Sequence, residues 1–232
     1  MDIELRGTLC DNETADIYRW FGWRDITCPG DISEALAAVP DGESITLLIN
    51  SPGGDMTAGT EIASVLRRSG KKCTALIQGY AASAATIAMC GCGDIASEPG
   101  ALLCYHNPSV DASGDYREHQ KTAEEMKNAK EAILDMYQHR FPEMDRQEVS
   151  ALMNRDMWIT PAQALEYKLL DRVVEYAGEE APAGMRIAAS AAALPIVTPT
   201  MRAAYEQHMA EKKEAEEQEK AARAKWALRR GI

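Results

Sequence analysis

Ser83 follows the run Gly79-Tyr-Ala-Ala82 and stands at the expected start of a short helix of small residues. A serine hydroxyl at this position would lie beside the unpaired backbone N–H groups of a helix N-terminus, which stabilise developing negative charge. The small side chains around it leave room for a substrate backbone to approach. The pattern is compatible with a nucleophilic serine, although Ser83 taken alone is more typical of an ordinary N-cap.

A nucleophilic serine needs a base within hydrogen-bond reach and an acid that orients the base. The chain has four histidines, and His119, His139 and His208 lie in charged segments where solvation is the simplest interpretation. His106 instead ends an apolar run and precedes Asn107-Pro108, so a buried strand would position it. His106 is therefore the candidate base, and a satisfied core histidine is the alternative.

Two aspartates are candidates for the orienting acid. Asp156 lies in the run Asn154-Arg-Asp-Met-Trp158 between two expected helices, and Asp171 follows the second of these helices. Both residues flank short helices, and periodicity does not choose between them.

A pair of glycines, Gly53 and Gly54, follows a run that reads as a buried strand. Their permissive backbone could turn an N–H group into a cleft, where it would complement the N–H group of Ala84 as an oxyanion hole. A bare Gly-Gly pair would be only a turn.

An alternation of strands and helices must position these residues. Short β-branched runs that end in turn residues predict strands, and apolar residues at three-to-four spacing predict helices. We expect strands at 3–6, 44–50, 72–78, 94–97, 101–105 and 172–175. We expect helices at 31–39, 58–68, 82–89, 116–140, from 145, at 160–168 and at 201–232. This order predicts an α/β fold of β-α-β units with a parallel sheet, whose ligand crevice lies at the carboxyl ends of the strands.

Composition excludes several classes of function. The 232 residues carry a formal charge of −11, and the first 180 show no basic face, which disfavours binding to duplex nucleic acid. No apolar stretch reaches the ~18 residues of a membrane span, and the N-terminus lacks a signal peptide pattern. Six cysteines without a disulfide spacing predict a reducing cytoplasm, and Cys90-x-Cys92 reads as packing residues rather than a metal or redox pair.

The composition changes after Ala177. We expect a folded domain over 1–177, an Ala/Pro-rich linker over 178–200 and a charged helical tail over 201–232. The tail carries eight Lys and Arg residues against six Glu residues, which is typical of an exposed helix or of a docking segment.

Five blocks between Ile3 and Glu175 agree in order and spacing with one known family. They are Ile49-Asn-Ser-Pro-Gly-Gly54, Gly79-Tyr-Ala-Ala-Ser-Ala84, Tyr105-His-Asn-Pro108, Arg155-Asp-Met-Trp-Ile-Thr-Pro161, and Ala164-Leu-Glu-Tyr167 with Leu170-Asp171. The chain thus resembles the Clp-type serine peptidases (ClpP), which share a fold with crotonases.

The resemblance implies a catalytic set of Ser83 as nucleophile, His106 as general base and Asp156, rather than Asp171, as orienting acid. It also implies that the enzyme needs no metal or organic cofactor and that 1–177 is the peptidase domain. The oxyanion donors that it implies are Gly54 and Ala84. The substrate-binding residues that it implies are Gly53, Asp55, Met56, Pro108 and Ser109, which flank an extended peptide added as a strand.

Two departures from the housekeeping members point to the phage and prophage branch, implicated in capsid maturation. The chain starts almost directly at its first strand, without the axial segment that contacts an unfoldase ring, which argues against an ATPase partner. The tail after Ala177 is foreign to the housekeeping enzyme. The resemblance further implies a homo-oligomeric ring, heptameric or stacked through helix 116–140, in the cytoplasm of a bacterial host, acting on peptides or on capsid and scaffold proteins.

The prediction is an ATP-independent serine endopeptidase that works through an acyl-enzyme. Two alternatives come from other classes. One is a ring that scaffolds capsid shells with secondary or lost catalysis, which a fluorophosphonate would not label. The other is a crotonase-like acyl-CoA enzyme, whose turnover would survive Ser83→Ala.

Overall fold

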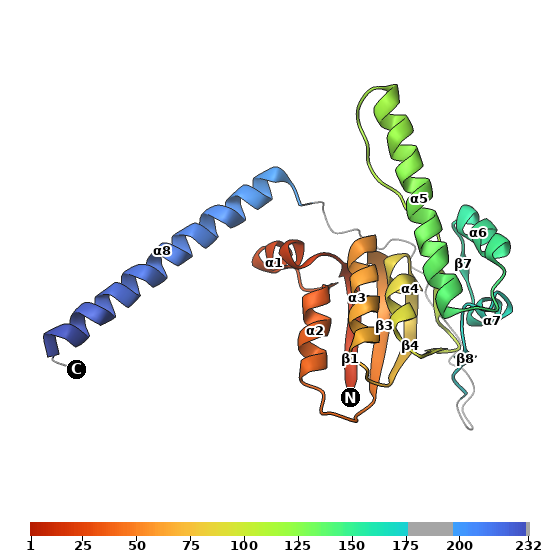
Figure 1. Cartoon of the computed structure of the whole chain (residues 1–232), viewed down its shortest axis with the longest axis horizontal. Helices are drawn as coiled ribbons and strands as arrows, with labels where there is room; N and C mark the ends of the chain where they lie inside the picture. Colours follow the sequence, from red (N-terminus) through yellow and green to blue (C-terminus); the bar gives the residue numbers. More distant parts are fainter. Residues whose placement is uncertain (176–196, 231–232) are drawn as a thin grey trace. The chain divides into compact units, whose positions relative to one another are not determined.

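The computed structural model of the chain describes residues 1–175 and 197–230 (Figure 1). The chain divides into two compact units. The first comprises residues 1–12 and 25–175 of the described chain, and the second comprises Glu13–Arg24 and the residues from 197 onward. Most of the linker predicted at 178–200 lies outside the described residues.

The first unit is built on an eight-stranded sheet. Its strands are β1 (Asp2–Leu9), β2 (Ile26–Thr27), β3 (Ile45–Gly54), β4 (Cys73–Ala82), β5 (Asp94–Ser97), β6 (Leu102–Cys104), β7 (Trp158–Ile159) and β8 (Arg172–Val173). The order along the main path is β2-β1-β3-β4-β5-β8, and β6 pairs with β4 beyond the end of β5. All of these pairings are parallel except β6 with β7. The predicted α/β fold with a parallel sheet is confirmed.

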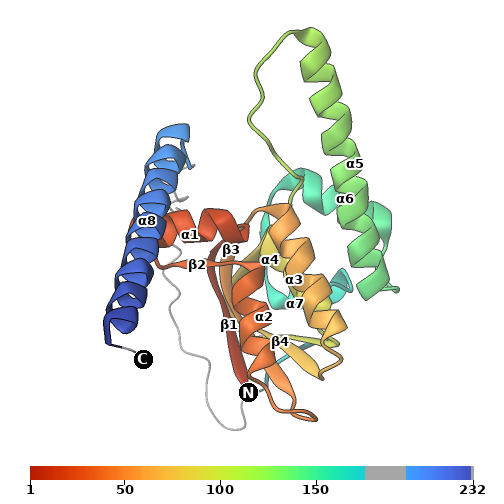
Figure 2. The same cartoon turned by 60° about the vertical axis from the view of Figure 1, so that its left-hand side comes forward.

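Helices connect the strands and cover the sheet. They are α1 (Asn12–Trp20), α2 (Pro29–Ala37), α3 (Met56–Arg68), α4 (Ala84–Ala88), the 3₁₀ helix η1 (Met89–Gly91), α5 (Tyr116–Arg140), α6 (Arg146–Arg155), α7 (Pro161–Glu166) and α8 (Pro199–Arg230). Of these, α2, α3 and α4 lie together on one face of the sheet (Figure 1). One end of α5 packs beside them and the other extends beyond the sheet, as Figure 1 and Figure 2 both show.

The core lies between the sheet and this helical layer. Alternate residues of β1, β3 and β4 are buried, and Leu5, Leu47 and Ile77 have no exposed surface. Ile62 and Leu66 of α3 fill the space above them at helical spacing. Each fully buried aliphatic side chain of this kind contributes roughly 1.5–3 kcal/mol. The core therefore fixes the strands whose carboxyl ends carry the candidate site residues.

Several element boundaries differ from the sequence-based expectation. The capping residue expected to open α2, Asp31, lies one turn inside the helix, and its carboxylate accepts from the N–H group of Cys28, the true N-cap residue. Pro29 occupies the first helical position, for which its fixed φ is suited. Strands β3 and β4 run four residues further than expected, because parallel pairing continues past the apolar runs.

The expectation that Cys90 and Cys92 are both packing residues is wrong for Cys92. Cys73, at the start of β4, forms a disulfide with Cys92, which precedes β5. The pairing of β4 with β5 brings these two residues together although 19 positions separate them. Cys90 remains a free buried thiol that donates to the carbonyl oxygen of Thr86, and burial raises its pKa to about 12.

The second unit joins α1 to α8. An ion pair links Glu13 to Arg202, the ring of His208 stacks on Trp20 at 5.3 Å, and Tyr205 meets the same indole edge-on at 6.1 Å. The helix predicted over the tail is confirmed, and His208 lies in an aromatic cluster rather than in solvent alone. No helix in the described parts of the chain is long and apolar enough to cross a membrane.

Candidate active site

Ser83 occupies a sharp turn between the end of β4 and the first residue of α4. Its backbone has φ 53° and ψ −127°, a conformation that costs a non-glycine residue roughly 1–3 kcal/mol. The turn is held on both sides, since the Ser83 N–H group donates to the carbonyl oxygen of Cys104 (2.9 Å) and the Ser83 carbonyl accepts from the N–H group of Thr86 (2.9 Å). The local fold therefore presents the hydroxyl at the N-terminus of α4.

The end of β3 passes directly against this turn. Gly53 has φ +86°, and a Cβ atom there would lie 2.5 Å from the carbonyl oxygen of Ala82 and 2.7 Å from the nitrogen of Ala84. Only glycine fits this approach. The buried hydroxyl of Ser51 fixes the loop, because it donates to the carbonyl oxygen of Gly7 (2.6 Å) and accepts from the N–H group of Gly53 (3.1 Å).

A cavity of about 90 Å³ opens at this turn. Ser83 and His106 both line it, although 22 residues separate them in the chain. One wall of the cavity is formed by the end of β3, the first residues of α3 and α4, and the segment after β6. Its residues are Gly54, Met56, Ala84, Asn107, Pro108 and Ser109. Ile87 of α4 and Ile133 and Tyr137 of α5 complete it with apolar surface.

His106 follows β6 and is half-buried. Its Nδ1 atom lies 2.6 Å from the carbonyl oxygen of Asn107. A carbonyl oxygen can only accept, so Nδ1 carries the proton and Nε2 is left as the basic nitrogen. This is the tautomer that a general base needs, and here the backbone holds it. In the described part of the chain, no hydrogen bond joins His106 to Ser83 or to Asp156.

Asp156 caps the end of α6 in a left-handed conformation, with φ 50° and ψ 51°, and its side chain is exposed. Its Oδ1 atom accepts from the thiol of Cys104 at 3.9 Å, so the carboxylate lies beside the strand that leads into His106. Burial, followed by the charge of Asp156 and this hydrogen bond, raises the pKa of Cys104 to about 11.

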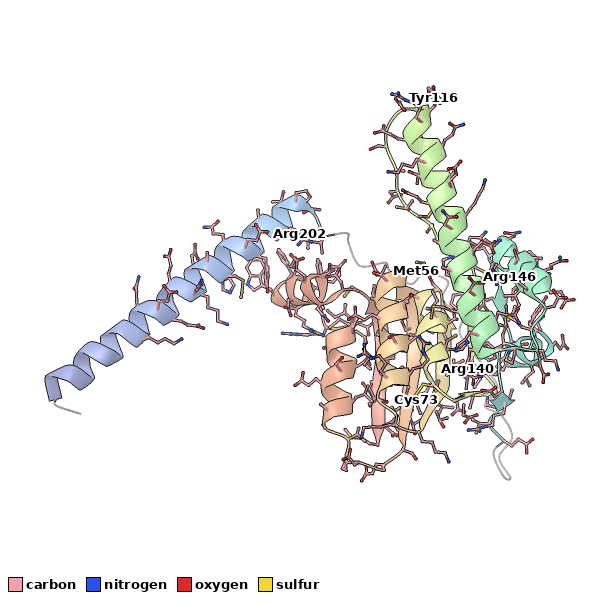
Figure 3. All side chains as sticks on the ribbon, viewed as in Figure 1. Met56, Cys73, Tyr116, Arg140, Arg146 and Arg202 are labelled. Atoms are coloured by element: carbon pink, nitrogen blue, oxygen red, sulfur yellow. A yellow bond between two sulfur atoms is a disulfide. The ribbon has the colours of Figure 1, made fainter. Side chains whose placement is uncertain are left out.

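Asp171 is engaged elsewhere. Its carboxylate forms an ion pair with Arg140, at the C-terminal end of α5 (Figure 3), and accepts from the N–H group of Ile95 at 2.7 Å. It lines a different cavity from the one that contains Ser83. The carboxylate of Asp171 therefore serves to tie α5 to the start of β5.

The structure brings most of the predicted site residues to the cavity wall. Those that line it are Gly54, Met56, Ser83, Ala84, His106, Pro108 and Ser109. Gly53 lies behind the Ser83 turn, and the side chain of Asp55 caps α3 by accepting from the N–H group of Ala58 (2.8 Å).

Sequence reasoning missed the contribution of α5 to this cavity. The resemblance assigned helix 116–140 to the stacking of rings. Its apolar residues at helical spacing form a stripe of Ala123, Met126, Ile133 and Tyr137, and of these Ile133 and Tyr137 are buried and line the cavity. The helical period of the stripe was visible in the sequence, whereas the surface that it covers is set by tertiary packing.

Among the residues described, no group of three or more His, Cys, Asp or Glu side chains is placed to hold a metal ion. The site instead combines a hydroxyl, an imidazole and backbone N–H groups beside an apolar wall, which is a set suited to acyl transfer.

Comparison with known proteins gives a consistent match. A family model described as Clp protease matches residues 32–177. The chain is 31% identical over 153 residues to the ATP-dependent Clp protease proteolytic subunit 1 of Streptomyces avermitilis. The alignment covers 65% of this chain and 70% of the relative. It is 28% identical over 197 residues to the ATP-dependent Clp protease proteolytic subunit 3 of Rhodococcus jostii, which covers 78% of this chain and 92% of the relative.

Proposed function

The chain belongs to the Clp protease family, and on that premise we propose that it is a serine endopeptidase with Ser83 as nucleophile, His106 as general base and Asp156 as orienting acid. All three residues fall inside the matched region, 32–177. The observation that carries the proposal is that Ser83, on a strained turn, and His106, in the basic tautomer, line the same cavity.

The reaction follows from these positions. His106 Nε2 removes the proton of Ser83 as Oγ attacks the peptide carbonyl, and the resulting oxyanion is stabilised by the N–H groups of Gly54 and Ala84. Collapse of the tetrahedral intermediate expels the amine, which takes the proton from His106, and leaves an acyl-enzyme. Water, deprotonated by His106, then hydrolyses the ester.

The carboxylate of Asp156 is proposed to replace the Asn107 carbonyl as the partner of Nδ1 when the site is engaged. Its contact with Cys104 places it beside β6, the strand that leads to His106. The pairing of Asp171 with Arg140 supports the choice of Asp156 over Asp171. Such hydrogen bonds often tighten only in the substrate complex.

Substrate would bind as an extended strand between the segments that begin at Gly53 and at Pro108. Met56, Ile87 and Ile133 line the cavity beside Ser83, so an apolar side chain is favoured on the residue that precedes the cleaved bond.

Cleavage of an unfolded protein by purified full-length chain tests the proposal. We expect turnover by the wild type and its loss, by several orders of magnitude, in Ser83→Ala, with unchanged secondary structure and assembly. Cleavage by Ser83→Ala at near wild-type rate would remove Ser83 from the mechanism.

The finer proposal is an ATP-independent enzyme that forms a homo-oligomeric ring and acts in phage capsid maturation. Two helices outside the matched region support this proposal: α1, before residue 32, and the long helix α8, after residue 177. Incubation of the full-length protein with purified phage capsid and scaffold proteins, without nucleotide, tests it. Cleavage of those proteins is the expected result, and a requirement for a separate ATPase would overturn it.

A further inference from the structure

A chain of buried hydroxyl groups lies behind the Ser83 turn. Thr86 Oγ1 is 2.6 Å from the carbonyl oxygen of Ser83 and 2.6 Å from the hydroxyl oxygen of Tyr137. Thr86 has no exposed surface, and Tyr137 is 2% exposed. These short contacts connect α5 to the turn that carries the proposed nucleophile.

The direction of the chain is fixed by elementary hydrogen-bond chemistry. The Ser83 carbonyl can only accept, so Thr86 donates its one hydroxyl proton to it. Tyr137 must then donate to Thr86. Burial raises the pKa of Tyr137, which keeps the phenol protonated and able to donate at any working pH.

The Ser83 carbonyl, at the end of this series of hydrogen bonds, belongs to the same peptide unit as the N–H group of Ala84. The carbonyl of Ser83 and the N–H group of Ala84 lie in one plane and, in a trans peptide, point in opposite directions. The Ser83 carbonyl points back to Thr86, so the N–H group of Ala84 points away from Thr86. Ala84 itself lines the cavity. Holding the carbonyl therefore aims the oxyanion donor.

We propose that Thr86 and Tyr137 are positioning residues that orient the Ser83–Ala84 peptide, and with it the Ala84 oxyanion donor, through their hydroxyl groups. The inference rests on the proposed function. It assigns a task to two residues that do not act on substrate through these groups, since Thr86 does not line the cavity and the Tyr137 hydroxyl is engaged by Thr86.

The test compares variants that remove a hydroxyl while keeping the shape of the side chain. For Thr86→Val and Tyr137→Phe we expect the rate of phosphonylation of Ser83 by a fluorophosphonate, and kcat for peptide cleavage, to fall on the order of tenfold, with KM within about twofold. Thr86→Ser restores the hydroxyl and should restore the rate. The double variant should be little slower than Thr86→Val, because both changes break one chain.

Tyr105→Phe is the matched control. Tyr105 is also a fully buried tyrosine, its hydroxyl donates to the carbonyl oxygen of Leu169 at 3.2 Å, and it does not line the cavity. It should lose stability as Tyr137→Phe does and keep the wild-type rate of phosphonylation by the fluorophosphonate.

Phosphonylation of Thr86→Val at the wild-type rate, or an equal loss of rate in Tyr105→Phe, would overturn the inference. Failure of the proposed function is a separate outcome, because the wild type itself would then not be labelled.

Discussion

The two sides of the proposed catalytic site are built differently. On the nucleophile side, the backbone of Ser83 is held by Cys104 and Thr86 within a buried environment, and Gly53 closes the turn from behind. On the acid side, Asp156 is exposed, and its carboxylate accepts a hydrogen bond from the thiol of Cys104 at 3.9 Å. The proposed oxyanion donor, the N–H group of Ala84, is thus held by contacts within one chain, whereas the proposed pairing of His106 with Asp156 would form only when substrate binds.

The acid side gives the largest expected effect. Asp156→Asn should lower kcat on the order of 10⁴-fold, because an amide that donates to Nδ1 favours the wrong imidazole tautomer. Asp171→Asn is the control, since it breaks the pair with Arg140 outside the cavity and should reduce thermal stability with activity within a few-fold. Peptide cleavage by both variants checks this, and the reverse ranking would return the orienting role to Asp171.

On the nucleophile side, adding one methyl group at Gly53 should distort the turn that carries Ser83. Gly53→Ala places a Cβ atom 2.5 Å from the backbone oxygen of Ala82, which has no room to yield, so acylation of Ser83 should fall by at least about 100-fold. Gly70→Ala is matched, because Gly70 also has a positive φ, +67°, but its Cβ would meet nothing within 4 Å. Equal acylation rates in the two variants would show that the approach of β3 does not shape the turn.

The smallest effect concerns the thiol that contacts Asp156. The folded-state pKa of Cys104, about 11, is raised above its ordinary value of 9.0, so its contribution to stability is present below pH 9 and is lost as the pH rises toward 11. Cys104→Ser replaces the thiol with a hydroxyl, which can still donate a hydrogen bond but does not titrate in that range. Chemical denaturation at several pH values should show a steeper loss of stability between pH 9 and 11 in the wild type. The same pH dependence of stability in both proteins would mean that folding does not raise the pKa of the Cys104 thiol.

Sequence patterns predicted the strands and helices that carry Ser83 and His106, because buried β-branched runs and capping residues are local signals. Helix α5 has the predicted bounds, and the capping residues Asp145 and Thr160 open α6 and α7 as expected. The two-residue strands β2 and β7 were missed, since they exist only through pairing with distant residues.

Within the site, local patterns could not find what depends on contacts across the fold. Thr86 read as one more small residue of a short helix, and its role depends on Tyr137, 51 positions away. The disulfide between Cys73 and Cys92 depends in the same way on the register of β4 with β5. The partner of Asp156 likewise emerged only from the pairing of β6 with β7.

The central claim is that His106 activates Ser83, and locating a covalent adduct tests it most directly. The full-length protein is treated with a fluorophosphonate, digested and analysed by mass spectrometry, beside His106→Ala. We predict a single adduct, on the peptide that contains Ser83, and labelling at least about 100-fold slower in His106→Ala. An adduct on another residue, or equal labelling of the two proteins, would contradict the account.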